Sequence, residues 1–183
     1  MSKLIALLKG FPGHPSHPPL TDASIGAYTA GTLMLILGAL GVEEEQMAHG
    51  GLLAISGGLI LAAPTALTGL LDWLALPNGT PMRRLGTIHL FTMVSATLVF
   101  ALAWLLQRPG YNHATVKPGG WIAALGAEAL LAVGGYMGGT LVFVYGFRVR
   151  GERDVPVSQA LAPRPEEPAA TVDDGRFAEP RLP

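Results

Sequence analysis

Two histidines stand close together near the start of the chain, in the stretch GHPSHPPLTDAS (Gly13–Ser24). Imidazole is a ligand for transition metals and for haem iron, so His14 and His17 are the first candidates for chemistry. The neighbouring prolines fix φ and favour extended backbone, so the stretch is not expected to be an ordinary helix. In a polyproline II conformation the two imidazoles lie about 9 Å apart, too far for one metal ion unless a turn at Pro15 and Ser16 closes the gap.

Further polar side chains lie inside long apolar segments, where each one costs free energy in lipid. Thr65, Thr68 and Asp72 share one helical face, His89 stands early in the next segment, and Tyr145 ends the last one. In antiparallel helices Asp72, His89 and Tyr145 fall with the two histidines in one layer about 5–8 Å deep. Three arginines surround that layer: Arg83, Arg84 and Arg148. We take this layer as the candidate site.

One carboxylate lies deeper than the others. Glu128 falls about two turns inside the last apolar segment. At that depth it must pair, take up a proton or face water.

The elements that must position these groups are membrane helices. The 183 residues are 50% hydrophobic and 14% charged, against about 25% charge in a typical soluble domain. Four apolar segments are each long enough to cross a hydrocarbon core of about 30 Å as a helix. They are Ile25–Val42, Gly51–Leu76, Leu85–Leu106 and Trp121–Phe147. Short loops between them predict an all-α, up-down bundle of four transmembrane helices in a lipid bilayer.

The flanks differ from this membrane domain, which we place at residues 13–150. Residues 1–12 hold a short apolar run between Lys3 and Lys9, which predicts a short amphipathic helix in the headgroup region. Residues 151–183 are rich in proline and acids, which predicts a disordered tail.

Charge predicts the orientation and excludes some classes of protein. Up to Arg153, the side with both termini and the second loop carries seven Lys or Arg residues, and the other side carries Arg108 and Lys117. This bias places both termini in the cytoplasm. The net charge of −1 gives no basic patch for nucleic acid, and the absence of cysteine excludes thiolate metal sites and disulfides.

Several stretches together resemble a bacterial membrane family, domain of unknown function 2231. The resemblance covers roughly residues 13–150 and rests on HPSHPPLTDAS, TGLLDW, His89, Arg108 and GGTLVFVYGFRV. In relatives a histidine often stands at the position of Tyr145, so a site that uses it is altered here. The resemblance implies a four-helix protein of the bacterial inner (plasma) membrane with a link to electron transfer.

Three functions remain open at this point. The first is an accessory or structural subunit of a membrane redox system, in which a polar cluster only locks the bundle. Glycines of the last segment then pack closely on a redox partner or a second copy. These glycines are Gly134, Gly135, Gly138 and Gly139.

The second function is a redox protein that binds haem b or a transition metal. His14 or His17 with His89 would be the axial ligands of a haem, and Arg83 or Arg84 would hold its propionates. His14, His17, Asp72 and His89 would hold a metal ion instead. The third function is a small transporter or proton pathway that uses Asp72, His89 and Glu128. A soluble-type enzyme is disfavoured because the sequence has no nucleophile–base pattern and no phosphate-binding loop.

Overall fold

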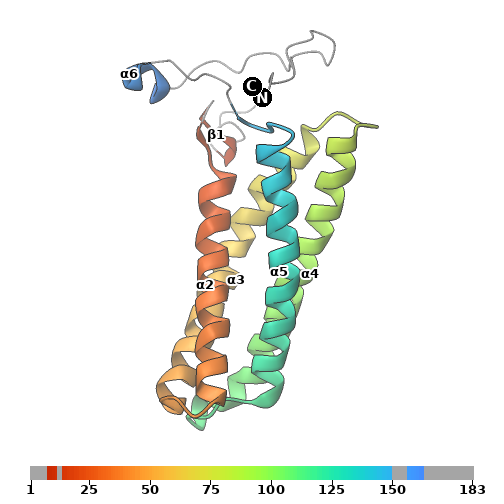
Figure 1. The fold of residues 1–183 in the computed structure, drawn as a ribbon. Helices are drawn as coiled ribbons and strands as arrows, with labels where there is room; N and C mark the ends of the chain where they lie inside the picture. The colour runs from red at the N-terminus through yellow and green to blue at the C-terminus, as the bar shows by residue number, and fades with distance from the viewer. Residues whose placement is uncertain (1–7, 12–13, 150–155, 163–183) are drawn as a thin grey trace, which may run out of the picture.

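Four long helices form the body of the protein, and they run alternately up and down (Figure 1). The computed structural model describes residues 8–11, 14–149 and 156–162. The helices are α2 (His17–Ala39), α3 (Glu44–Leu74), α4 (Pro81–Asn112) and α5 (Pro118–Phe143). All four are long and apolar enough to cross a membrane, which confirms the predicted all-α membrane bundle. We call the end where α2 and α4 begin the proximal end, and the opposite end the distal end.

The first helix begins earlier than the sequence predicted. Ser16 is the N-cap of α2, and Pro18 and Pro19 occupy the first helical turn. The expected start near Ile25, and the expected exclusion of helix from this whole stretch, are therefore wrong. The reason is that the first-turn N–H groups have no partner within a helix, so proline costs little there and its fixed φ suits a helix start.

Proline has the same role at two other helix starts. Pro81 and Pro118 begin α4 and α5, with Thr80 accepting a hydrogen bond from the Arg83 N–H at 3.1 Å as an N-cap. The α3 helix also starts earlier than its expected segment, at Glu44 rather than Gly51. The loops are consequently shorter than expected, and α3 and α4 extend beyond their apolar segments.

The flanking segments are described only in part. Gly10–Phe11 (β1) pairs antiparallel with His14–Pro15 (β2), so these residues are strand rather than the end of an amphipathic helix. Of the rest of that predicted helix, Leu8 and Lys9 are helical, and residues 1–7 and 12 lie outside the described residues. Of the predicted tail, residues 156–162 are described, and Val157–Ala160 (α6) forms one helical turn. The remainder of the tail also lies outside the described residues.

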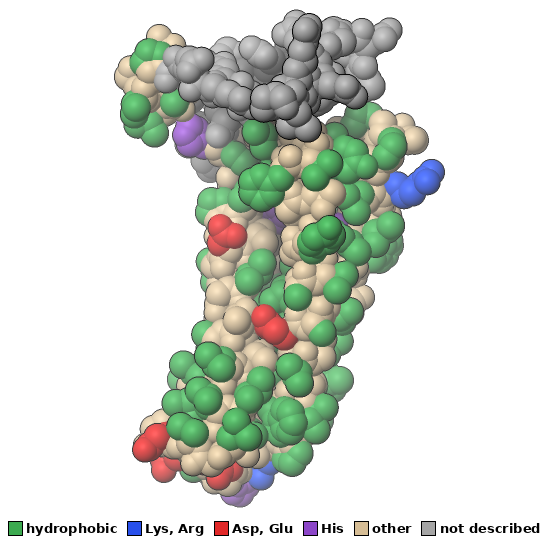
Figure 2. Space-filling model, viewed as in Figure 1, with side chains coloured by type: hydrophobic (Ala, Val, Ile, Leu, Met, Phe, Trp, Pro, Cys, Tyr) green, Lys and Arg blue, Asp and Glu red, His purple; other side chains and the backbone are tan. Residues whose placement is uncertain are grey.

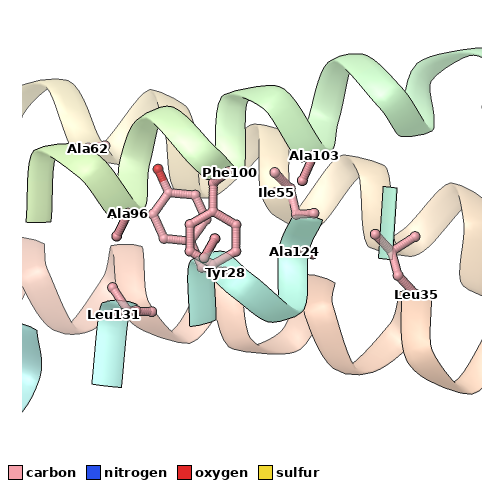
Figure 3. Close-up of a cluster of buried hydrophobic side chains, with 10 residues drawn as sticks. Tyr28, Leu35, Ile55, Ala62, Ala96, Phe100, Ala103, Ala124 and Leu131 are labelled. Atoms are coloured by element: carbon pink, nitrogen blue, oxygen red, sulfur yellow. The ribbon is translucent and has the colours of Figure 1, made fainter. Parts of the chain in front are cut away.

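The bundle consists of two tightly packed hairpins, α2 with α3 and α4 with α5. The helices of the first hairpin approach closely at Gly31 and Gly51, since a Cβ added to either glycine would lie within 3.2 Å of the other's carbonyl oxygen. A stacked ring pair joins the hairpins, with the centroids of Tyr28 and Phe100 4.0 Å apart (Figure 3). Small buried residues such as Ala96 and Ala124 surround this pair.

The outer surface of the bundle is apolar. Large hydrophobic side chains are exposed along all four helices, and the visible face carries them along its length, with acidic side chains also in its middle part (Figure 2). Acidic side chains gather at the distal end of that face. An apolar band around long helices is the surface that a bilayer solvates.

Candidate functional site

His17 lies at the first residue of α2 and points onto α3. Its Nδ1 is 3.1 Å from the Thr65 carbonyl oxygen and 3.2 Å from Thr68 Oγ1. A carbonyl can only accept, so Nδ1 carries the proton and Nε2 has the lone pair in the neutral ring. Gly69 lies directly beneath the ring, because a Cβ there would come within 2.7 Å of His17 Cε1.

His89 has a similar arrangement in the second hairpin. Its Nδ1 is 2.9 Å from the carbonyl oxygen of Gly134 on α5, which again fixes the proton on Nδ1. Gly138 lies beneath this ring, because a Cβ at that position would be 3.2 Å from His89 Cε1. Each hairpin therefore holds one imidazole by a backbone carbonyl and a glycine.

The two imidazoles lie in the same part of the bundle. His17 interacts electrostatically with His89, Asp72 and Arg148. Figure 2 shows histidine side chains recessed between the helices at one level near the proximal end. The predicted layer thus brings together His17, His89 and Asp72, which come from three different helices.

Asp72 is paired with an arginine from beyond the end of α5. Arg148 donates to Asp72 Oδ1 through Nε at 3.1 Å and through a terminal nitrogen at 2.6 Å. The Asp72 side chain is 9% exposed. A buried carboxylate needs such a counter-charge in a medium of low dielectric constant. The Nδ1 atoms of His17 and His89 bond to backbone carbonyls rather than to Asp72.

The backbone bends sharply to bring Arg148 to this position. Gly146 has φ 66° and Arg148 has φ 62°, which is unusual for a residue with a side chain. The Phe147 N–H donates to the Leu141 carbonyl at 3.0 Å and closes the turn. Tyr145 lies on this turn, outside α5, and is exposed. This turn positions an ion pair that links α3 to the segment after α5.

Arg83 is held by the end of α3. It donates to the carbonyl oxygens of Trp73 and, at 3.1 Å, of Leu76, and its guanidinium lies 3.7 Å from the centroid of the Trp73 ring. These contacts satisfy carbonyls that a helix C-terminus leaves without partners. Arg84, the next residue, is exposed in the first turn of α4.

Thr65 and Thr68 support His17 from α3. Thr68 Oγ1 donates to the Pro64 or Thr65 carbonyl at 3.0 Å, and Thr65 Oγ1 lies 3.1 Å from Ser24 Oγ on α2. All three hydroxyl side chains are buried. The bond between Ser24 and Thr65 joins α2 to α3 near His17. The sequence analysis placed Thr65 and Thr68 on the same helical face as Asp72.

The proposed metal ligands do not form a cluster. Within the described ranges, no three His, Asp or Glu side chains come close enough together to hold a metal ion. His14, on β2, is exposed at the surface. The haem alternative needs two imidazoles, and His17 and His89 are the pair that the fold brings into one region.

Glu128 and the glycines of α5 lie elsewhere. Glu128 accepts a hydrogen bond from Thr29 on α2 at 2.7 Å, halfway along the bundle. Of the four glycines of α5, Gly134 and Gly138 face Met93 and His89 of α4. An added Cβ at Gly135 would meet nothing, and one at Gly139 would meet only Phe143 of α5 itself. Packing of α5 on a second copy stays a prediction. It now concerns only Gly135 and Gly139, because Gly134 and Gly138 already pack on α4.

Sequence reasoning missed several of these contacts. It placed Arg148 at the rim but did not assign it to Asp72, although a buried carboxylate with arginines in the same layer signals such a pair. It also missed Gly69 beneath His17 and the Thr29 partner of Glu128. Depth along the helices would have indicated Thr29, while nothing in the sequence marks Gly69.

These observations define the chain as a four-helix membrane protein with a polar layer near one end. The family of predicted membrane proteins with domain of unknown function 2231 matches residues 13–151, so the chain belongs to this family. No curated protein and no solved structure matches the chain.

Proposed function

We propose that the bundle binds haem b between its two hairpins and transfers electrons within a membrane redox system. His17 and His89 would hold the haem iron in this proposal. The observation that carries it is the matched setting of the two imidazoles, each held at Nδ1 by a backbone carbonyl of the partner helix.

The donor chemistry of both rings fits a haem. An Nδ1–H bonded to a carbonyl fixes the tautomer and leaves the Nε2 lone pair for iron, as in metal-ligating histidines generally. Two imidazoles from separate helices are also what a bundle needs for axial ligation. Haem held there supplies one-electron transfer, while Thr65 and Gly134 keep the two rings oriented.

The surrounding charges fit the same site. Arg84 is exposed at the proximal rim and is the residue that we assign to a propionate. Arg83 already donates to the end of α3, and Arg148 contacts Asp72. The Arg148 guanidinium compensates the negative charge of the Asp72 carboxylate near His17.

An optical spectrum of the protein, purified from cells supplied with a haem precursor, tests this proposal. We expect a Soret band and sharp α and β bands on reduction. His17→Ala and His89→Ala should abolish these bands, whereas His14→Ala and His49→Ala serve as matched controls and should retain them. Bands that survive the loss of both His17 and His89 would contradict the assignment.

A second candidate is the accessory subunit, in which the same groups only lock the bundle. The observation in its favour is that Asp72, Arg83 and both imidazoles all have partners within the chain. A colourless protein whose melting temperature falls on loss of His17 or His89 supports this candidate over the haem protein.

We also infer that the chain lies in a bacterial plasma membrane with its proximal end in the cytoplasm. The basis is the excess of Lys and Arg in the segments that this end connects. Reporter fusions after Arg153 should then read as cytoplasmic, and fusions at His113 as external. The opposite pattern would overturn the orientation.

A further inference from the structure

We propose that Glu128 is a proton-binding site within the membrane, a neutral carboxylic acid that reacts with hydrophobic carbodiimides. This site is separate from the histidine layer and does not depend on a haem. It lies where α2 and α5 meet, at the Thr29 side chain of α2.

The position of Glu128 is deep along its helix. It stands about 15 Å from the start of α5 and about 22 Å from its end, at a rise of 1.5 Å per residue. Large apolar side chains of the same helix are exposed around it, among them Leu125 and Ile122. Thr29, its partner on α2, is likewise near the middle of its helix. The carboxyl group therefore lies well inside a hydrocarbon core of about 30 Å.

Only one of the two carboxyl oxygens has a hydrogen bond among the described residues. Oε1 accepts from the Thr29 hydroxyl at 2.7 Å. Oε2 is buried and has no hydrogen-bond partner in the described part of the chain. An ionised carboxylate with one neutral donor in lipid would be strongly disfavoured, whereas a carboxylic acid tolerates it far better.

The four helices carry no Lys or Arg near Glu128 that could balance a negative charge there. The sequence has no Lys or Arg between Lys9 and Arg83, so α2 and α3 carry none, and α5 carries none either. On α4, Arg84 and Arg108 stand near opposite ends, and the intervening His89 donates to Gly134. The other ionisable groups on α2 and α3 are carboxylates, histidines near the helix ends and the Tyr28 phenol. Binding a proton is the remaining way to neutralise Glu128.

A neutral carboxyl group in an apolar setting has a specific reactivity. Its proton passes to one nitrogen of a carbodiimide, and a carboxyl oxygen bonds to the central carbon. The acyl group then shifts to nitrogen and gives a stable N-acylurea, so the protein gains the mass of one reagent and nothing leaves. At a wet, ionised carboxylate, water removes the intermediate and restores the acid.

Labelling of the full chain in proteoliposomes with dicyclohexylcarbodiimide tests the proposal, with the site read by mass spectrometry. We expect one label, on Glu128, and at least a ten-fold loss of labelling in Glu128→Gln. Asp22→Asn, a matched change at an exposed carboxylate of α2, should leave the label unchanged. Asp72 should stay unlabelled because it is paired with Arg148. Labelling of exposed carboxylates with none at Glu128 overturns the proposal.

Infrared spectroscopy gives a second test, which needs neither the carbodiimide nor a folded Glu128→Gln variant. Wild-type protein should show the C=O stretch of a protonated carboxyl group, which shifts in D₂O if the proton exchanges. Thr29→Val removes the hydrogen bond to Oε1, so the band should move to higher frequency and labelling should persist. A wild-type spectrum without such a band means that Glu128 is ionised.

Discussion

The two ends of the bundle use polar side chains in different ways. At the distal end, buried Gln107 accepts from the Lys117 N–H at 2.9 Å and donates to the Thr115 carbonyl at 3.0 Å. Glu44 accepts from the Val116 N–H, and His49 donates to the Tyr111 carbonyl. At the proximal end, Arg83 has the same role for the carbonyls at the end of α3. His17 and His89, by contrast, bond to carbonyls inside helices, and Asp72 bonds to an arginine side chain.

This difference separates structural polar groups from candidate functional ones. Loop backbone between α4 and α5 has no helical partners, so side chains such as Gln107 must satisfy it. The carbonyls of Thr65 and Gly134 lie inside helices and already accept from the backbone, so the imidazoles are not needed there. An imidazole that bonds to an already satisfied helix carbonyl is therefore better evidence for function than a buried amide that satisfies loop backbone.

The largest expected effect is the loss of the proximal ion pair. Asp72→Ala should lower the free energy of unfolding by about 3 kcal/mol, because the Arg148 guanidinium loses its carboxylate in a largely buried site. The double variant with Arg148→Ala should cost clearly less than the sum of the single variants. Thermal unfolding in detergent measures both, and strictly additive effects would mean that the pair does not stabilise the fold.

A smaller loss is expected at the distal end. Gln107→Leu leaves the Lys117 N–H and the Thr115 carbonyl without partners, and we expect a loss of about 2 kcal/mol. The reduced-minus-oxidised spectrum of a haem-loaded protein should stay unchanged, since the change is far from the histidines. A spectral change in this variant would break the distinction between the two ends.

The two glycines of α5 give a matched pair of smaller changes. Gly138→Ala forces the His89 ring to shift and should cost about 1 kcal/mol. Gly135→Ala meets no atom within 4 Å and should be neutral or slightly stabilising, because alanine is the better helix former. Melting temperatures of the two variants compare them directly. Equal losses would show that the close contact with His89 has no special role.

The smallest effect is expected for His14. His14→Ala changes an exposed side chain on a two-residue strand and should alter stability by less than about 0.5 kcal/mol. His17→Ala removes a partly buried side chain and its hydrogen bond to the Thr65 carbonyl, and should cost more. Chemical denaturation of the two variants would show whether the two histidines of one motif differ as their burial indicates.

Much of the fold could be predicted from the sequence because the bilayer leaves few alternatives. An apolar segment of membrane length must satisfy its own backbone, so helices follow from hydropathy alone. The helix starts could not be predicted as well, because proline is compatible both with a loop and with the first helical turn. His17 thus becomes the first residue of α2, instead of part of an extended segment before it.

The layer of the site followed from topology, whereas the partners within it did not. Short loops place Asp72 and His89 near the same end, and this needs no side-chain detail. The pairing of Asp72 with Arg148 depends on a turn with two positive φ angles after α5. Such a turn depends on tertiary contacts, and the sequence offers three arginines at the same rim without ranking them.

The division into two hairpins has a consequence for the order of assembly. His17 is fixed by α3 and His89 by α5, so each hairpin already contains one complete half of the histidine layer. Membrane helices can associate after each has inserted on its own. The half on α2 and α3 can therefore form before the second hairpin is synthesised, and docking of the hairpins brings the two halves together. A chain cut in the loop at residues 75–80 would yield two fragments, each with its own imidazole in place, and only their reunion would restore a complete layer.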